Sequence, residues 1–456
     1  LEGHGRHEIT PGMDLSRTVG WFTSIHPARL DAGAKGGSMG AALKAVKEQL
    51  RAVPDTGIGH GMLRHLNPHT AQRLKKLPRP QIAFNYLGRF PARQDADWAV
   101  AVDADVLTAG ADDRLPLTHA LSVNAVTEDH PDGPQLTITC TWAGELLPER
   151  DVRDLGDAWI AALTALAEHA HAPGAGGRTP SDLPLVSVTQ QEIDRFEERW
   201  KVSDVLPLSS LQEGLLFHAV YDDQGPDVYV VQLALELEGR VDAHRLRAAG
   251  QALLRRHPNL SAGFVTRGTG QPVQVIPAEV ELPWHEVDLR AVTDDDRPAR
   301  LADVVAGEAA RRFDMEQPPL LRFALARLDE ERYTFILTFH HILLDGWSMP
   351  VVINELFALY GERDDAAGLP RVAPYRDYLT WLATRDREAT KAVWAETMAG
   401  LDEPCRLVPG EPGDVTIEPR QILRSVPAEL TEALQARARS RGLTMNTLVQ
   451  GAWGLL

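Results

Sequence analysis

Apolar and polar positions alternate along the chain in two rhythms, which predict a mixture of strands and helices. Residues 138–142 alternate as in a strand, and residues 151–169 repeat apolar side chains at helical spacing. Residues 172–182 are rich in Gly and Pro and have no period, which indicates a linker, and a short helix is expected at 190–199. We therefore expect three segments, residues 1–171, 172–203 and 204–456.

The third segment shows a regular succession of elements. Residues 206–217 predict a helix, and residues 228–237 predict a strand. Asp242 then caps another amphipathic helix. A strand at 333–339 and an apolar helix at 351–360 enclose a short loop. We expect that loop to carry the chemistry.

Composition and charge describe a globular protein and narrow the classes of partner. Hydrophobic residues make up 44% of the chain and charged residues 24%, and no run of about 18 apolar residues exists to span a bilayer. The formal charge of −17 argues against nucleic acid, whose binding draws on clustered Lys and Arg. Cys140 and Cys405 suggest neither a disulfide framework nor a zinc ribbon. We expect an α/β protein of the cytoplasm, with neither nucleic acid nor membrane as partner.

Both ends of the sequence indicate a piece of a longer chain. Residues 1–6 contain no initiator Met and no signal-peptide region. Residues 443–456 read as the apolar first half of a helix without a cap. We expect further parts of the same protein on each side.

The loop after the strand at 333–339 carries the strongest chemical signal. It reads His340-His341-Ile342-Leu343-Leu344-Asp345-Gly346-Trp347-Ser348. Side chains alternate at a strand end, so one imidazole can be exposed while the other points away. The exposed imidazole can accept a proton from an attacking amine or hydroxyl, and Asp345 can hold the turn or fix a tautomer. Gly346 permits a tight turn and can bring a backbone N–H near a developing oxyanion.

Two other interpretations of these histidines stay open at this point. A His-His doublet can be a buried pair beside an Asp-Gly turn. Together with Asp345 the two histidines can also form part of a metal site, although they alternate faces and have no His or Cys cluster nearby.

The pattern His-His-x-x-x-Asp-Gly after a strand resembles the signature of condensation domains of nonribosomal peptide synthetases, which share the fold of chloramphenicol acetyltransferase. Three further segments resemble motifs of that family in the family's order, residues 206–217, 256–260 and 375–378. The resemblance implies that His341 is the catalytic histidine. It implies that the neighbouring loop residues belong to the same site, namely His340, Gly346, Trp347 and Ser348. Asp345 is expected to be structural and ion-paired to Arg256 or Arg322.

The same resemblance implies the substrates and partners. A donor acyl thioester and an acceptor aminoacyl thioester would each arrive on the phosphopantetheine arm of a separate carrier domain, and the acceptor amine would attack the donor carbonyl near His341. No P-loop or adenylation motif is visible, so adenylation domains elsewhere in the synthetase would activate the amino acids. No metal and no nucleotide are expected. The family's later motifs are absent, so residues 204–456 would hold the first lobe and the start of the second.

The first 90 residues resemble, in order, the second lobe of an epimerization domain at residues 2–6, 14–24, 54–61 and 84–88. Such domains remove and return the α-proton of a carrier-bound thioester, which needs acid/base groups and stabilisation of an enolate. By motif match Glu2 is one acid/base, with Arg17, Asn85 and Tyr86 as polar companions. His7 and His60 depart from the family pattern. The lobe bearing that domain's own histidine motif would precede Leu1.

The order of the two resemblances implies a D-configured donor for the condensation step. A free-standing acyltransferase of the same fold that uses coenzyme A is an enzymatic alternative, against which the tandem arrangement argues. A non-catalytic docking or recruitment domain is the other alternative. It would be expected to lose the histidine motif, which here is intact.

Overall fold

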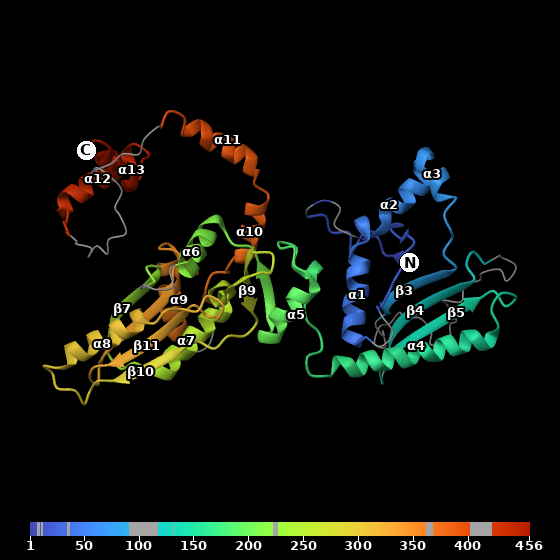
Figure 1. Cartoon of the computed structure of the whole chain (residues 1–456), viewed down its shortest axis with the longest axis horizontal. Helices are drawn as coiled ribbons and strands as arrows, with labels where there is room; N and C mark the ends of the chain where they lie inside the picture. The colour runs from blue at the N-terminus through green and yellow to red at the C-terminus, as the bar shows by residue number, and fades with distance from the viewer. Residues whose placement is uncertain are drawn as a thin grey trace, which may run out of the picture. The chain divides into compact units, whose positions relative to one another are not determined.

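The computed structural model describes residues 1–6, 10, 12–33, 37–90, 117–130, 132–221, 227–361, 368–401 and 422–456. They form two compact units, Leu1–Arg385 and Asp386–Leu456. Strands and helices are mixed in the first unit (Figure 1), which confirms the expected α/β class. In its described part, the second unit consists of three helices, α11 (Arg387–Thr397), α12 (Ala428–Ser440) and α13 (Met445–Gly454).

The first region of the larger unit is built on a three-stranded sheet in the order β3-β4-β5. Its strands are β3 (Ile82–Phe90), β4 (Leu121–His130) and β5 (Gly133–Trp142). Strand β3 runs parallel to β4, and β5 runs antiparallel to it. The long helix α4 (Glu149–Ala170) follows, as the apolar spacing at 151–169 predicts.

Smaller elements complete this region. The two-residue strands β1 (Glu2–Gly3) and β2 (Ser24–Ile25) pair antiparallel. Helix α1 (Met39–Arg51) begins at Ser38, whose side chain accepts a hydrogen bond from the Ala41 N–H. Four short helices precede β3, namely η1 (Pro54–Gly57), α2 (Ile58–Gly61), η2 (Met62–Leu66) and α3 (Pro68–Leu74).

The core of the first region is small. Leu121 and Val123 of β4 and Val152 of α4 are its buried members. Trp159 of α4 packs against Phe84 of β3, with ring centroids 5.9 Å apart. Helix α4 therefore covers one face of the sheet, as packing of a helix stripe on an alternating strand requires.

A connector leads to the second region. It contains η3 (Pro180–Asp182) and α5 (Gln190–Arg199), the short helix expected at 190–199. Thr189 caps α5 in a capping box with Glu192. Strand β6 (Val202–Leu206) follows and pairs antiparallel with β9 (Pro272–Pro277), whose other neighbour is β8 (Gly263–Thr266).

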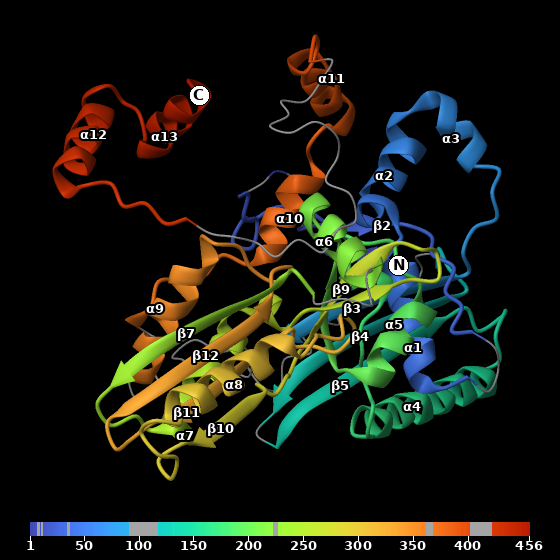
Figure 2. The same ribbon diagram turned by 60° about the vertical axis from the view of Figure 1, so that its left-hand side comes forward.

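The second region centres on a four-stranded sheet in the order β10-β11-β12-β7 (Figure 2). The strands are β7 (Val230–Glu238), β10 (Trp284–Asp288), β11 (Leu321–Arg327) and β12 (Arg332–His340). Strand β12 pairs antiparallel with both β11 and β7, so it is an inner strand. Every residue from Tyr333 to His340 is buried, because helices cover both faces of the sheet.

The two faces of this sheet differ in chemistry. Phe335, Leu337 and Phe339 belong to a large apolar core with α7 (Ala243–Arg256) and α9 (Ser348–Gly361). A Cβ on Gly250 of α7 would lie 2.5 Å from Leu282 and 2.8 Å from Phe323. That glycine thus lets α7 approach the sheet closely. The opposite face carries polar residues and is covered by α8 (Arg297–Ala310).

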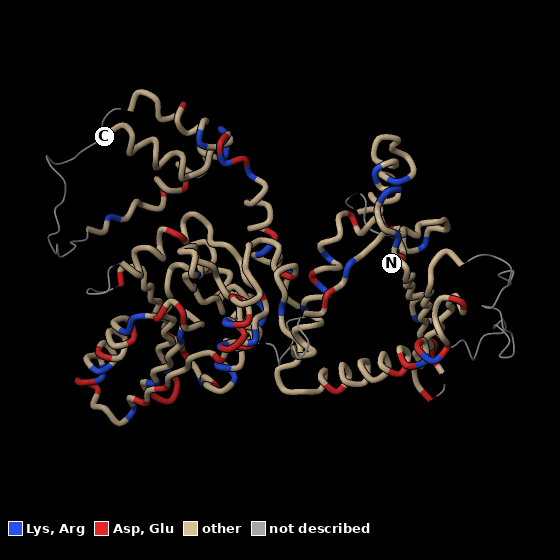
Figure 3. Tube along the Cα trace, turned by 45° about the vertical axis from the view of Figure 1, so that its right-hand side comes forward, with Lys and Arg blue, Asp and Glu red and all other residues tan. Residues whose placement is uncertain are grey.

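Two further helices flank the loop that follows β12. Helix α6 (Ser210–Tyr221) comes from the segment predicted at 206–217, and α10 (Tyr375–Ala383) from the last of the matched motifs. Along the described chain, charges of both signs are interspersed (Figure 3). The helices of this part of the protein are all too short or too polar to cross a membrane.

Candidate functional site

The site begins where β12 ends, at a buried histidine. His340 is fully buried and accepts a hydrogen bond at Nδ1 from the Ile342 N–H at 3.1 Å. Its Nε2 lies 3.3 Å from Oδ2 of Asp227, at ion-pair distance but without hydrogen-bond geometry. Burial lowers the pKa of His340, opposed by the Asp227 carboxylate. The ring is therefore neutral at pH 7, with its proton on Nε2.

The adjacent histidine is exposed, as alternation at a strand end predicts. The backbone N–H of His341 donates to the Tyr229 carbonyl at 2.8 Å. Nδ1 of the ring lies 2.9 Å from the Leu344 carbonyl oxygen. A carbonyl can only accept, so Nδ1 carries the proton and the lone pair of the neutral ring is on Nε2.

Buried side chains and a glutamine fix the loop that holds His341. Ile342, Leu343 and Leu344 are all buried in the large core. Gln212 of α6 donates from Nε2 to the Ile342 carbonyl at 3.1 Å, in a buried contact. Its Oε1 accepts from the Ser209 N–H at 3.0 Å, so one side chain joins the start of α6 to the histidine loop.

A third helix joins the same contact. The hydroxyl of Tyr375 in α10 donates to Oε1 of Gln212 at 3.4 Å. Burial raises the pKa of Tyr375, and the nearby Asp345 charge acts in the same direction. Three segments that resemble family motifs, in α6, the histidine loop and α10, therefore meet at Gln212.

Asp345 holds the turn, but not through the expected ion pair. Its Oδ1 accepts hydrogen bonds from the Ser348 N–H at 2.9 Å and from the Ser348 hydroxyl at 2.8 Å. These bonds lower the pKa of Asp345. Neither Arg256 nor Arg322 contacts Asp345, so the prediction of an arginine partner among these two was wrong.

The two arginines instead brace helices elsewhere in the lobe. Arg256 and His257, at the end of α7, both contact Glu355 of α9, at 2.8 and 2.7 Å. Arg322 of β11 is buried and pairs with Glu308 of α8 at 2.9 Å. Burial and opposite charge require each arginine to satisfy the carboxylate nearest to it, so neither is available to the loop.

The remaining loop residues are open to solvent. Gly346 has no positive φ, and a Cβ there would meet nothing within 4 Å. The turn therefore does not need glycine, contrary to the expectation, and the space beside Gly346 is open. Trp347 is 90% exposed, and Ser348 is half-buried through its bonds to Asp345.

This arrangement can act as a proton or hydrogen-bond acceptor. His341 is exposed, its tautomer is set by the Leu344 carbonyl, and its Nε2 makes no hydrogen bond with any described residue. Positioning by fixed groups is what general-base or orienting roles require. Among the described residues, no group of three or more His, Cys, Asp or Glu is arranged to hold a metal ion.

The residues matched to epimerization in the first region are dispersed. Glu2 is exposed and borders a cavity of about 590 Å³ that His26, His60 and Phe84 also line. Burial lowers the pKa of His26, and its Nδ1 has no hydrogen-bond partner among the described residues. The structure thus places Glu2 beside a histidine-lined cavity.

The expected companions of Glu2 are not among the described residues that line this cavity. Arg17 is exposed, and Asn85 is half-buried in β3. The Tyr86 hydroxyl lies 2.9 Å from the hydroxyl of Thr127. His7, one of the departures from the family pattern, falls outside the described residues.

Sequence reasoning missed three residues of the histidine site. Asp227 lies beside His340, Gln212 holds the Ile342 carbonyl, and Glu355 joins the end of α7 to α9. Gln212 stands inside the segment matched to the opening motif, so that motif was a usable signal. Asp227 and Glu355 had no signal, because their partners lie about 100 residues or more away in sequence.

The chain matches known proteins over its whole length. The model of the family described as "Condensation domain" matches residues 1–183 and 202–456. A linear gramicidin synthase of Brevibacillus parabrevis is 37% identical over all of this chain, which spans 6% of that relative. Chondramide synthase cmdD of Chondromyces crocatus is 33% identical, and the chain spans 13% of it. The chain thus covers only a small part of these relatives.

Solved structures give a weaker likeness. The cyclization-docking bidomain of the EpoB NRPS from Sorangium cellulosum is 21% identical, with a TM-score of 0.47 over 70% of this chain and 60% of that one. The first condensation domain of the calcium-dependent antibiotic synthetase is 24% identical, with a TM-score of 0.42 over 53% and 58%.

Proposed function

Because this chain belongs to the condensation-domain family, we propose that its second region forms amide bonds in a nonribosomal peptide synthetase, with His341 as the catalytic residue. The donor is a peptidyl or aminoacyl thioester and the acceptor an aminoacyl thioester, each on the phosphopantetheine arm of a carrier domain. Adenylation domains of the same synthetase load those arms. The observation that carries the proposal is the fixed tautomer of the exposed His341, Nδ1–H to Leu344.

The chemistry follows from that tautomer. The acceptor amine attacks the donor carbonyl, a C–N bond forms, the C–S bond breaks, and the donor arm leaves as a thiol. Nε2 of His341 accepts a hydrogen bond from the attacking amine and can take its proton as the C–N bond forms. His340 does not share this role, because it is buried, neutral and protonated on Nε2.

The test uses a complete two-lobed condensation domain with these residues, supplied with carrier-bound donor and acceptor. His341→Ala is expected to lower the rate of amide formation by about 10²–10⁴-fold, the usual contribution of a positioned acid/base group. His244→Ala, at an exposed position of α7, is the matched control and is expected to leave the rate unchanged. A near-normal rate for His341→Ala would sink the assignment.

We propose further that residues 1–171 are the second lobe of an epimerization domain, so that the donor reaching the condensation lobe is D-configured. Glu2 is the acid/base of this half-site. Its support is the position of Glu2 on the histidine-lined cavity and the order of the matched motifs. In the complete domain, exchange of the donor α-proton with deuterated solvent should vanish in Glu2→Gln. Retained exchange would overturn the role of Glu2 and leave that of His341 untouched.

A further inference from the structure

The connector between the two regions is held by one face of helix α1. Lys44 Nζ lies 3.0 Å from Asp194 and 3.4 Å from Glu197 of α5. Lys47 Nζ lies 2.5 Å from Asp182. These contacts tie a helix of the first region to two separate elements of the connector, η3 and α5.

The same face of α1 makes a second layer of contacts with η3. Arg51 donates to Oδ1 of Asp182 at 2.9 Å and to the Ser181 hydroxyl at 3.1 Å. Glu48 accepts from the Ser181 hydroxyl at 2.6 Å and from its N–H at 3.2 Å. The four α1 residues follow one another at helical spacing, so they form a single stripe of charge, Lys44, Lys47, Glu48 and Arg51.

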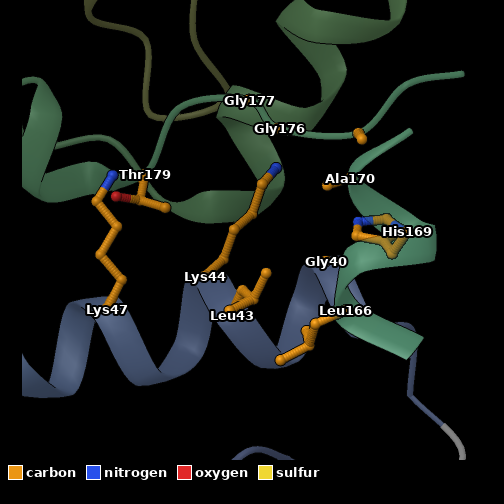
Figure 4. A pocket seen from close by; sticks show the side chains of 11 residues that line it. Gly40, Leu43, Lys44, Lys47, Leu166, His169, Ala170, Gly176, Gly177 and Thr179 are labelled. Carbon is orange, nitrogen blue, oxygen red and sulfur yellow. The ribbon is translucent and has the colours of Figure 1, made fainter. Parts of the chain in front are cut away.

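The backbone of the connector is shaped to meet this stripe. Gly177 has φ +96°, and a Cβ there would lie 2.4 Å from Oε2 of Glu197. The Arg178 N–H donates to the other oxygen of Glu197 at 2.6 Å. Figure 4 shows Lys44 and Lys47 rising from α1 toward this glycine turn, beside a cavity of about 440 Å³.

These ion pairs are shielded enough to matter. The side chains of Lys44, Glu197 and Asp182 are 20%, 20% and 15% exposed. Burial opposes ionisation of Asp182, yet hydrogen bonds from Lys47 and Thr179 hold its pKa well below the ordinary value. Partly buried pairs are screened by salt less than exposed ones, and a network of several contributes more than isolated surface pairs.

The connector is also pinned to the second region. Arg376 of α10 donates to the Asp182 carbonyl at 3.2 Å and to Asp204 of β6 at 3.1 Å. Asp182 therefore receives α1 through its carboxylate and α10 through its backbone. The Gly-rich sequence that predicted a spacer instead forms a junction.

We propose that Ser181, Asp182, Asp194 and Glu197 form a docking surface that recognises the upstream lobe through the charge stripe of α1. The partner that this surface fits is a helix with basic residues at positions i, i+3 and i+7 and an acid at i+4. The surface holds the two regions as one body and selects which upstream lobe can precede this condensation lobe. This inference does not depend on the catalytic activity of either region.

The experiment uses the full chain and measures hydrogen exchange of the backbone amides of residues 176–183, together with the rate of tryptic cleavage after Arg178. The double variant Lys44→Glu/Lys47→Glu is expected to raise both rates at least about tenfold, because it places acids against Asp182, Asp194 and Glu197. Lys75→Glu/Lys76→Glu makes the same charge change at exposed positions of the first region and should leave both rates unchanged.

Pairwise rescue separates recognition from general destabilisation. Lys44→Glu with Asp194→Lys should exchange more slowly than Lys44→Glu alone. Gly177→Ala tests the junction without a charge change and should open it more than Gly174→Ala, since both glycines have positive φ but a Cβ at Gly174 meets nothing within 4 Å. The proposal fails if the Lys44/Lys47 variant behaves like the Lys75/Lys76 control, or if the Asp194 change restores nothing.

Discussion

The two regions of the larger unit rest on sheets of very different quality. In the second region, β12 is an inner strand buried on both faces, and its end delivers His340 and His341 in opposite directions. In the first region the sheet has only three strands among the described residues, and Tyr86 of β3 is half exposed. The difference teaches that a densely covered sheet holds its motif in place, whereas the sparsely covered sheet leaves its matched residues apart.

The largest expected effect follows from this difference in packing. Leu337→Ala in β12 should cost about 4–5 kcal/mol of unfolding free energy, because the surrounding core cannot collapse into the cavity. Leu121→Ala in β4, also buried, should cost about 2–3 kcal/mol, because its core cluster is small. Urea unfolding of each variant, followed by region-specific hydrogen exchange, measures both values. Equal losses would remove the contrast.

Breaking the buried ion pair behind the sheet should rank next. Arg322→Met leaves Glu308 buried with weaker partners and should cost about 3–5 kcal/mol. Arg256→Met should cost less, since His257 stays 2.7 Å from Glu355. Unfolding free energies decide the order. A double variant, Arg322→Met with Glu308→Leu, should recover stability, and failure to recover would show that Arg322 has another acidic partner.

Loss of the glutamine contact should act mainly on the loop. Gln212→Leu removes the donor to the Ile342 carbonyl and should cost about 1–3 kcal/mol. In a complete condensation domain it should also lower the rate of amide formation, since small misplacements of a catalytic group are costly. Gln232→Leu, whose amide bonds Val305 and Thr338 away from the loop, is the control. Faster exchange at residues 340–348 in the control alone would contradict the account.

The smallest expected effect is a pH dependence in the second region. The Arg267 side chain lowers the pKa of Glu192 from 4.5 to about 2. A carboxylate with a lowered folded-state pKa stabilises the fold above its unfolded pKa, and this stability is lost as pH falls through the folded value. The stability gap between the natural chain and Glu192→Gln should therefore shrink between pH 4.5 and about 2. Unfolding curves across that range check the sign.

The sequence predicted local elements well and distant partners poorly. The strand before the histidines, the helix after them and the cap at Asp242 follow from periodicity and turn chemistry over a few residues, and the structure confirms them. The alternation of His340 and His341 follows from the same rule. The partner of Asp345 was wrong because it depends on which of several arginines the fold brings near, and here a local serine satisfies the carboxylate.

The linker at 172–182 shows the same limit from another side. Its Gly and Pro content indicates the absence of regular structure, which is correct for much of it, but says nothing of what the backbone contacts. The contacts of Ser181 and Asp182 come from α1, 130 or more residues earlier. Only the three-dimensional arrangement reveals that the segment is held on both sides.

The central claim is that the two histidines are opposite tautomers, with the lone pair of His341 on Nε2. Long-range proton–nitrogen correlation spectra of the full chain labelled with ¹⁵N-histidine measure this directly, with His341→Gln assigning the signal. The account predicts a protonated Nδ1 and an unprotonated Nε2 for His341, and the reverse for His340. A protonated Nε2 on neutral His341 would contradict it, because no lone pair would then face an incoming amine.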